Sequence, residues 1–254
     1  LHIGKLQSRN EKKYYTQPRT GLYIPPNFIP GPKINIIVYL HGYKFGYPSE
    51  SSAINEYWDA DNLPFFAFRE GLQRTRKNAV LVVPTLGPKS QAGDLLKYGI
   101  DAYLKKVITE LNNAGYSGEI EEVVLACHSG GGYVMARLAA KKNTTKIREC
   151  WGFDCLYRGT NFVPSKFWRN WAVKNKDKNL YLYHQSKRSV SEYSKLEEST
   201  KNLKNVYVER SKVEPTRMII FRNDSSKKRI SKIPVHFLIP IAHWEECINR
   251  HNWT

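Results

Sequence analysis

The sequence has no apolar run long enough to cross a membrane. The longest runs, such as Ile34 to Leu40, are much shorter than the roughly 20 residues that a transmembrane helix needs. Apolar residues nevertheless make up 41% of the chain and aromatic residues 13%, which is enough for a sizeable core. The length of 254 residues suits one α/β unit with a continuous sheet. We therefore expect a soluble protein with a single domain over residues 1–254.

Cysteine is scarce, with four residues in the chain: Cys127, Cys150, Cys155 and Cys247. They lack the paired spacing of a zinc site and are too few for a disulfide scaffold of this length. We therefore expect free, buried thiols. A disulfide between Cys127 and Cys155 is the alternative, and it would indicate an exported protein. The chain begins with Leu1, so it is either a mature form without its leader or a trimmed form, and its localisation stays open.

Acidic residues are few compared with basic ones. The chain has 23 Asp and Glu against 40 Lys and Arg, which gives a net charge of +17. Such a surface attracts polyanions, whether nucleic acid, anionic lipid or an acidic cell-wall polymer. The chain is also rich in Asn, Ile and Tyr, as coding sequences poor in G and C tend to be, so the charge is a weak guide to function. It comes with no nucleic-acid-binding motif, and we expect no specific nucleic-acid partner.

The segment from Glu121 to Ala140 predicts a buried strand, a glycine-rich turn and then a helix. In the turn, Ser129 is followed by Gly130, Gly131 and Gly132, and the missing side chains allow a strained backbone. A serine at such a strand-to-helix turn projects its hydroxyl into a cleft as a nucleophile. The amide of Gly130 lies at the helix start, where it can stabilise an anionic oxygen. The alternative is a helix start with Ser129 as its N-cap.

Two motifs resemble the α/β-hydrolase superfamily. The run His128-Ser129-Gly130-Gly131 resembles its nucleophile elbow, Gly-x-Ser-x-Gly, although the small residue Cys127 stands in place of the first glycine. Leu40-His41-Gly42-Tyr43, directly after the apolar strand predicted over Ile34 to Leu40, resembles the loop after the third strand of that superfamily. There the residue after His-Gly supplies the second oxyanion amide, so the resemblance implies this role for Tyr43.

Asp154 follows the strand predicted over Cys150 to Phe153. A carboxylate at the carboxyl end of a strand beside the elbow strand points into the same cleft, so we predict Asp154 as the triad acid. The alternative is an aspartate that serves a turn or a cap. Most of the superfamily places the acid after the next strand, predicted here over Leu180 to Tyr183. The nearest carboxylate after that strand is Glu192, the second candidate.

The last apolar run, Val235 to Ile241, predicts a final strand, and His243 follows it closely. The superfamily places its general base in the loop after the final strand, so the resemblance implies that His243 is the base. The chain order would then be Ser129, Asp154, His243. His236 is the competitor, but within a strand its side chain would lie on a face of the sheet.

The order strand, helix, strand, elbow, helix predicts an α/β fold: a mostly parallel, doubly wound sheet with flanking helices. An opening hairpin is predicted over Ile3 to Ile24. The aromatic segment within residues 158–178 either forms a short cap over the site or belongs to the core. Helices are predicted over Phe66–Arg74, Asp94–Asn112, Ser165–Asn175 and Val190–Leu203, and a further strand over Ala79–Pro84. Strands or extended segments are predicted over Asn205–Glu209 and Met218–Phe221.

The resemblance implies a serine hydrolase that cleaves an ester through an acyl-enzyme. Ser129 would attack, His243 and Asp154 would complete the triad, and the amides of Tyr43 and Gly130 would hold the oxyanion. This mechanism requires no metal or organic cofactor. The alternatives are an amidase or peptidase with the same triad, and a non-catalytic hydrolase-like module that binds an anionic polymer. We expect a small or polymeric acyl substrate, anionic if the basic surface is functional, and the oligomeric state stays open.

Overall fold

A computed structural model describes residues 20–43, 67–87, 90, 92–141, 146–185, 190–214, 217–220, 229–232 and 235–254. The strands are β1 (Thr20–Tyr23), β2 (Lys33–Leu40), β3 (Ala79–Pro84), β4 (Glu119–His128), β5 (Ile147–Phe153), β6 (Asn179–His184), β7 (Val206–Arg210), β8 (Arg217–Ile220) and β9 (Arg229–Lys232). The helices are α2 (Phe68–Thr75), α3 (Gly93–Tyr98), α4 (Ile100–Asn113), α5 (Gly131–Ala139), α6 (Pro164–Lys174), α7 (Val190–Thr200) and α8 (Val235–Asn249). None of these helices is long and apolar enough to span a bilayer.

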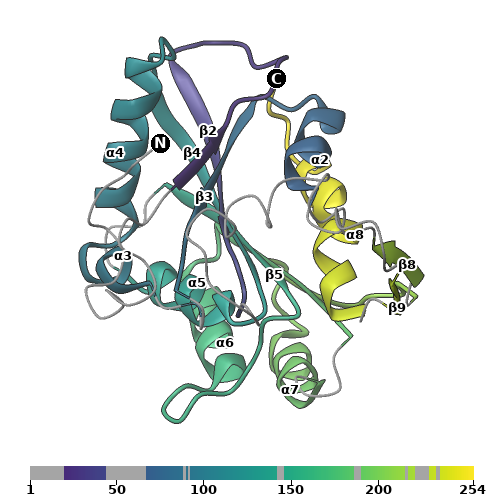
Figure 1. The fold of residues 1–254 in the computed structure, drawn as a ribbon. Coiled ribbons are helices and arrows are strands. Elements are labelled where there is room, and N and C mark those ends of the chain that lie inside the picture. Colours follow the sequence, from purple (N-terminus) through teal and green to yellow (C-terminus); the bar gives the residue numbers. More distant parts are fainter. Residues whose placement is uncertain are drawn as a thin grey trace.

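Seven strands form one sheet in the order β1-β3-β2-β4-β5-β6-β7, and β8 and β9 form a separate hairpin (Figure 1). The edge strand β1 runs antiparallel to β3, and every other neighbouring pair in the large sheet is parallel. The chain moves from β2 to β3 in one direction and then returns past β2 to β4. The carboxyl ends of β2 and β4 therefore form the switch point of a doubly wound sheet. The predicted fold class, a mostly parallel, doubly wound α/β sheet with flanking helices, is confirmed.

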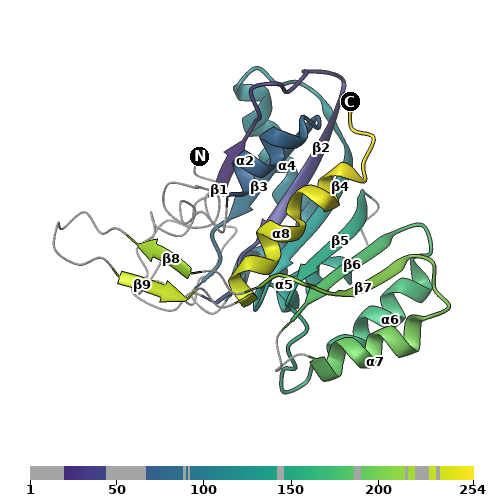
Figure 2. The same ribbon diagram turned by 90° about the vertical axis from the view of Figure 1, so that its right-hand side faces the viewer.

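The central strands are apolar on both faces because helices cover both faces of the sheet. Along β2, Ile36 and Val38 contribute to one core cluster, and Ile37 and Tyr39 contribute to the other. The first cluster includes side chains from α3 to α7, and the second includes side chains from α2 and α8. Figure 2 shows α8 lying across one face, with α6 and α7 beyond the opposite face. The sheet is thus the middle layer of three.

The predicted helix from Asp94 to Asn112 is two helices. The chain breaks at Gly99, which has φ 84° and ψ 176° between α3 and α4. Such a positive φ favours glycine because an L side chain would be strained there. The sequence predicted one continuous helix because the apolar spacing continues through Gly99 with little change in period.

The predicted final strand, Val235 to Ile241, is instead the first half of α8. Its apolar residues continue at helical spacing through Trp244 and Ile248, which are fully buried against the sheet. A short apolar run fits a buried strand and a buried helix equally well, which explains the error. Pro240 was a usable signal, since proline is rarely found inside a central strand.

The aromatic helix predicted over Ser165 to Asn175 is α6. Its Trp168 and Trp171 are buried in the first core cluster, packed edge to face at 5.4 Å. These two side chains therefore belong to the core, which was the alternative to lining a substrate pocket. A cap over residues 158–178 stays a prediction, and residues 3–19 of the predicted opening hairpin lie outside the described residues.

Candidate active site

Ser129 lies in a sharp turn between the elbow strand β4 and helix α5. Its φ is 53°, in the left-handed region, and its side chain is partly exposed. Its backbone N–H donates to the carbonyl of Phe153 at 3.1 Å, which holds the turn against β5. A non-glycine residue in this conformation costs on the order of 1–3 kcal/mol and persists only where the surroundings fix it. Ser129 therefore has the local geometry of a nucleophile elbow.

Backbone contact with neighbouring segments explains the glycines around Ser129. A Cβ at Gly131 would collide with the carbonyl of Leu40, at the end of β2. A Cβ at Gly42 would lie 2.7 Å from Cβ of Ser129 and 3.3 Å from its Oγ. The loop after β2 therefore lies directly against the candidate nucleophile, as the two sequence motifs suggested.

His41 fixes the conformation of this loop. The backbone N–H of Leu86 donates to Nε2 of His41 at 2.8 Å, so in the neutral ring the proton is on Nδ1. Nδ1 then donates to the carbonyl of Gly42 at 2.8 Å. The C=O and N–H of a trans peptide point in opposite directions, so this bond also fixes the direction of the Tyr43 N–H. The ring of Tyr43 lies against Gly130, and its side chain is half-exposed.

Asp154 lies beside Ser129 at the same edge of the sheet. His128 pairs with Phe153 in the β4–β5 register, so the residues that follow them, Ser129 and Asp154, are neighbours across the two strand ends. Asp154 also has a left-handed backbone, with φ 45°, and its N–H donates to the carbonyl of Tyr183 at 2.7 Å. Its side chain is fully buried. This acid is therefore held as rigidly as the serine.

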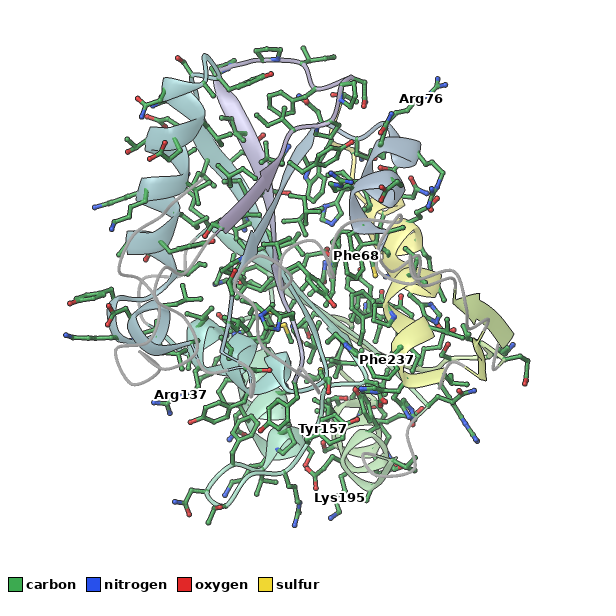
Figure 3. The ribbon with its side chains drawn as sticks, in the orientation of Figure 1. Phe68, Arg76, Arg137, Tyr157, Lys195 and Phe237 are labelled. Carbon is green, nitrogen blue, oxygen red and sulfur yellow. The ribbon has the colours of Figure 1, made fainter. Side chains whose placement is uncertain are left out.

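The imidazole that pairs with Asp154 is that of His236, near the start of α8. Nδ1 of His236 lies 2.6 Å from Oδ2 of Asp154. The hydroxyl of Tyr157 lies 3.4 Å from the same carboxylate oxygen and 3.5 Å from Nδ1 of His236. Tyr157 and Phe237, both labelled in Figure 3, pack against the imidazole with ring centroids 6.3 and 5.2 Å away. The ring is 24% exposed, so one side of it is open to a substrate.

His243, the base that the sequence predicted, has other partners. Its Nε2 lies 2.9 Å from Oγ of Ser211, its Nδ1 lies 3.1 Å from Oε2 of Glu246, and its ring stacks on Tyr183 at 3.9 Å. The predicted pairing of Asp154 with His243 is therefore wrong. The error follows from reading α8 as a strand, because a helix turns His236 toward the strand ends while a strand would have placed it on a sheet face.

Ser211, His243 and Glu246 have the bonding pattern of a second triad, but Ser211 is only 2% exposed. Burial alone would raise the pKa of Glu246, but the hydrogen bond from His243 and the charge of Arg250 outweigh it and lower that pKa. An ionised Glu246 therefore holds the His243 ring against Ser211. The buried hydroxyl is not reachable by a substrate, so this cluster fastens α8 to the end of β7.

Glu192, the second candidate for the acid, makes contacts that hold neighbouring helices together. It is 2% exposed and accepts hydrogen bonds from the N–H and hydroxyl of Ser165 and from Nε of Arg158. Burial alone would raise its pKa, but the Ser165 and Arg158 bonds lower it overall. Glu192 therefore connects α7 to the start of α6.

All four cysteines are free and buried, as expected from their spacing. Burial, with the neighbouring Cys155 thiol, raises the pKa of Cys127 well above its ordinary value. Burial likewise raises the pKa of Cys150. These thiols therefore stay protonated and contribute volume to the core. Within the described parts of the chain, no group of three or more His, Cys, Asp or Glu side chains is arranged to hold a metal ion.

No protein-family model matches the chain, and no curated protein sequence matches it. Similar solved structures include a poly(3-hydroxybutyrate) depolymerase from Bordetella parapertussis, at 10% identity and a TM-score of 0.45, over 79% of this chain and 80% of that one. A lipase-esterase related protein from Clostridium acetobutylicum has 13% identity and a TM-score of 0.44, over 91% and 98% of the two chains. An esterase from Pyrococcus furiosus has 12% identity and a TM-score of 0.44, over 98% and 96%. The fold assignment rests on the strand order and elbow geometry of this chain itself.

Proposed function

We propose that this protein is a serine hydrolase that transfers the acyl group of an ester to water, with Ser129, His236 and Asp154 as its triad. The observation that carries the proposal is the 2.6 Å contact between His236 Nδ1 and Asp154 Oδ2, beside a serine in a left-handed elbow. A buried carboxylate, an imidazole and a partly exposed, strained serine at the carboxyl ends of neighbouring strands are the parts of a triad. The chain order of serine, acid and histidine also agrees with an α/β-hydrolase.

In this mechanism the Asp154 carboxylate accepts a hydrogen bond from the Nδ1–H of His236, which leaves the lone pair of Nε2 free to accept a proton. Nε2 takes the proton of the Ser129 hydroxyl while Oγ attacks the ester carbonyl carbon. The resulting imidazolium is stabilised by the Asp154 carboxylate and gives its proton to the leaving alcohol. Water then attacks the acyl-enzyme with His236 again as the base, which regenerates Ser129.

The oxyanion would be held by the backbone N–H groups of Tyr43 and Gly130. Gly130 is the residue at the start of α5, where N–H groups lack helical partners and the helix dipole favours negative charge. Tyr43 follows the peptide carbonyl that His41 fixes, so its N–H is held before a substrate arrives. Donors that need no reorganisation are the most effective at stabilising a tetrahedral oxyanion.

A fluorophosphonate probe tests the nucleophile, because it reacts covalently with an activated serine. We expect labelling at Ser129, mapped by peptide mass spectrometry, and hydrolysis of p-nitrophenyl acyl esters. Ser129→Ala should abolish both signals. Ser211→Ala is the matched control, since it removes a serine hydroxyl that lies 2.9 Å from the Nε2 of a histidine. Labelling at Ser211, or no labelling of folded protein, would contradict the proposal and favour a binding module.

A further inference from the structure

The backbone carbonyl of His236 cannot receive its normal helical hydrogen bond. In an α-helix the carbonyl of residue i accepts from the N–H of residue i+4. For His236 that residue is Pro240, which lies inside α8 and has no N–H. The proline ring also crowds the carbonyl four residues before it, which tilts that carbonyl away from the helix. The backbone carbonyl oxygen of His236, the proposed base, is therefore available to accept a hydrogen bond from outside the helix.

The side chain of His128 donates a hydrogen bond to this carbonyl. Its Nε2 lies 3.0 Å from the carbonyl oxygen of His236. A carbonyl only accepts, so Nε2 carries a proton and donates it. The two imidazole rings also pack together, with centroids 4.3 Å apart and a tilt of 41°, and His128 is only 2% exposed. This contact joins side chain and backbone across 108 positions of the chain.

His128 is also the residue directly before Ser129, at the end of β4. One hydrogen bond therefore links the strand that carries the nucleophile to the helix that carries the base. The Asp154 contact fixes the ring of His236, whereas the His128 contact fixes its backbone. Together the two contacts fix both the ring and the backbone of His236 relative to the ends of β4 and β5.

We propose that His128 is a positioning residue for the hydrolase reaction, and that Pro240 keeps the His236 carbonyl free to receive its hydrogen bond. This inference rests on the proposed function, since it assigns a role to the base of that triad.

A neutral His128 suits this role. Burial, reinforced by the neighbouring His236, lowers the pKa of His128 well below its ordinary value, although the backbone hydrogen bond acts in the opposite direction. His236 becomes an imidazolium during acyl transfer, and a second positive ring 4.3 Å away would oppose that charge. The buried ring donates a hydrogen bond without adding a charge.

Two substitutions at position 128 separate positioning from packing. His128→Phe keeps a ring but removes the donor, and His128→Gln removes the ring but keeps a nitrogen donor near the position of Nε2. We expect His128→Phe to lower kcat for a p-nitrophenyl ester about 10- to 100-fold with little change in KM, because small misplacements of catalytic groups have effects of this size. His128→Gln should recover most of that loss. Equal kcat in His128→Phe and the wild type would overturn the proposal.

His251→Phe is the matched control for loss of a buried imidazole. His251 is 9% exposed and contacts Glu149 at 3.2 Å, near the amino end of β5 and thus at the opposite end of the sheet from Ser129. We expect this variant to lose stability but to keep the wild-type kcat. A kcat loss in His251→Phe as large as that in His128→Phe would show a general packing effect and overturn the positioning role.

Pro240→Ala tests the open carbonyl. Alanine restores an N–H at position 240 that can bond to the His236 carbonyl and hold it without His128. The kcat loss caused by His128→Phe should therefore be several-fold smaller in the Pro240→Ala background than in the wild type, which a double-mutant cycle measures. Equal losses in both backgrounds would overturn the role of Pro240.

A readout without turnover distinguishes this inference from the proposed function. The side-chain NMR signals of His236 should shift in His128→Phe but remain in place in His251→Phe, whether or not the protein hydrolyses esters. Unlabelled Ser129 together with shifted His236 signals would contradict the hydrolase and leave the contact intact. Labelled Ser129 with unshifted His236 signals would overturn the positioning role alone.

Discussion

Asp154 and His236 are 82 positions apart in the chain, yet Nδ1 of the histidine lies 2.6 Å from the buried carboxylate of the aspartate. The pair joins the end of β5 to the first turn of α8. Its carboxylate is fully buried and its imidazole is 24% exposed, so the charge is shielded while the base stays accessible. This asymmetry suits the acid and the base of the proposed triad.

The first prediction concerns the base. His236→Ala should lower kcat/KM for an ester about 10⁴-fold or more, because removal of a triad member leaves only binding and oxyanion stabilisation. His243→Gln should keep activity near that of the wild type, since His243 contacts Ser211 and Glu246. Steady-state kinetics on both purified variants check this. A collapse in His243→Gln with a normal His236→Ala would restore the assignment made from the sequence.

The second prediction concerns the acid. Asp154→Asn should lower kcat about 10⁴-fold, since an amide at this position favours the wrong imidazole tautomer. Glu192→Gln should keep turnover but lose about 1–3 kcal/mol of stability, because it disturbs buried hydrogen bonds from Ser165 and Arg158. Kinetics and urea unfolding measure the two effects separately. If the two variants exchanged these outcomes, Glu192 would be the acid.

The third prediction concerns the loop after β2. Gly42→Ala should lower kcat about 10- to 100-fold, because its Cβ would lie 2.7 Å from Cβ of Ser129 and displace either the serine or the loop. Gly31→Ala is the control, since a Cβ there meets no atom within 4 Å. Fluorophosphonate labelling rates of the two variants provide the measurement. Similar rates in both would show that the loop does not approach the nucleophile.

The fourth prediction concerns pH. Burial lowers the pKa of His128 and also that of His184, where Arg210 acts in the same direction and Asp154 in the opposite one. Each ring therefore takes up a proton at a lower pH in the folded protein than in the unfolded chain, where it becomes protonated below about pH 6.5. Because the unfolded state binds more protons, the free energy of unfolding should fall as pH drops, by up to about 1.4 kcal/mol per pH unit for each histidine.

Urea unfolding between about pH 7.5 and 5.5 checks this slope. His184→Gln should reduce this slope, and an unchanged slope would contradict a lowered pKa of His184 in the folded protein. Glu149 also has a lowered pKa, since the nearby His251 ring and the hydrogen bonds from Asn179 and Trp151 together outweigh its burial. The stabilisation from Glu149 is lost only below the pKa of about 4.3 that a glutamate has in the unfolded chain. The pH range of this effect therefore does not overlap that of the histidines.

The sequence determined the features that depend on neighbouring residues. β-Branched apolar runs predicted β2, β3 and β4, and the glycines after Ser129 predicted the elbow, because strand and turn preferences act over a few positions. The position of Asp154 directly after an apolar run also predicted a carboxylate at the end of a strand. These local signals were sufficient for the fold class and for two members of the proposed triad.

The tertiary structure decided which histidine meets Asp154. His236 and His243 are seven positions apart, so on a helix they lie two turns apart on nearly the same face, separated by about 10 Å along the axis. The first reaches the end of β5 and the second reaches Ser211 after β7. The sequence of this segment alone does not show which turn of α8 lies beside the end of β5 and which lies beside the end of β7. That is fixed by how α8 packs against α2 and the sheet, where Trp244 is buried and its Nε1 donates to the carbonyl of Phe68.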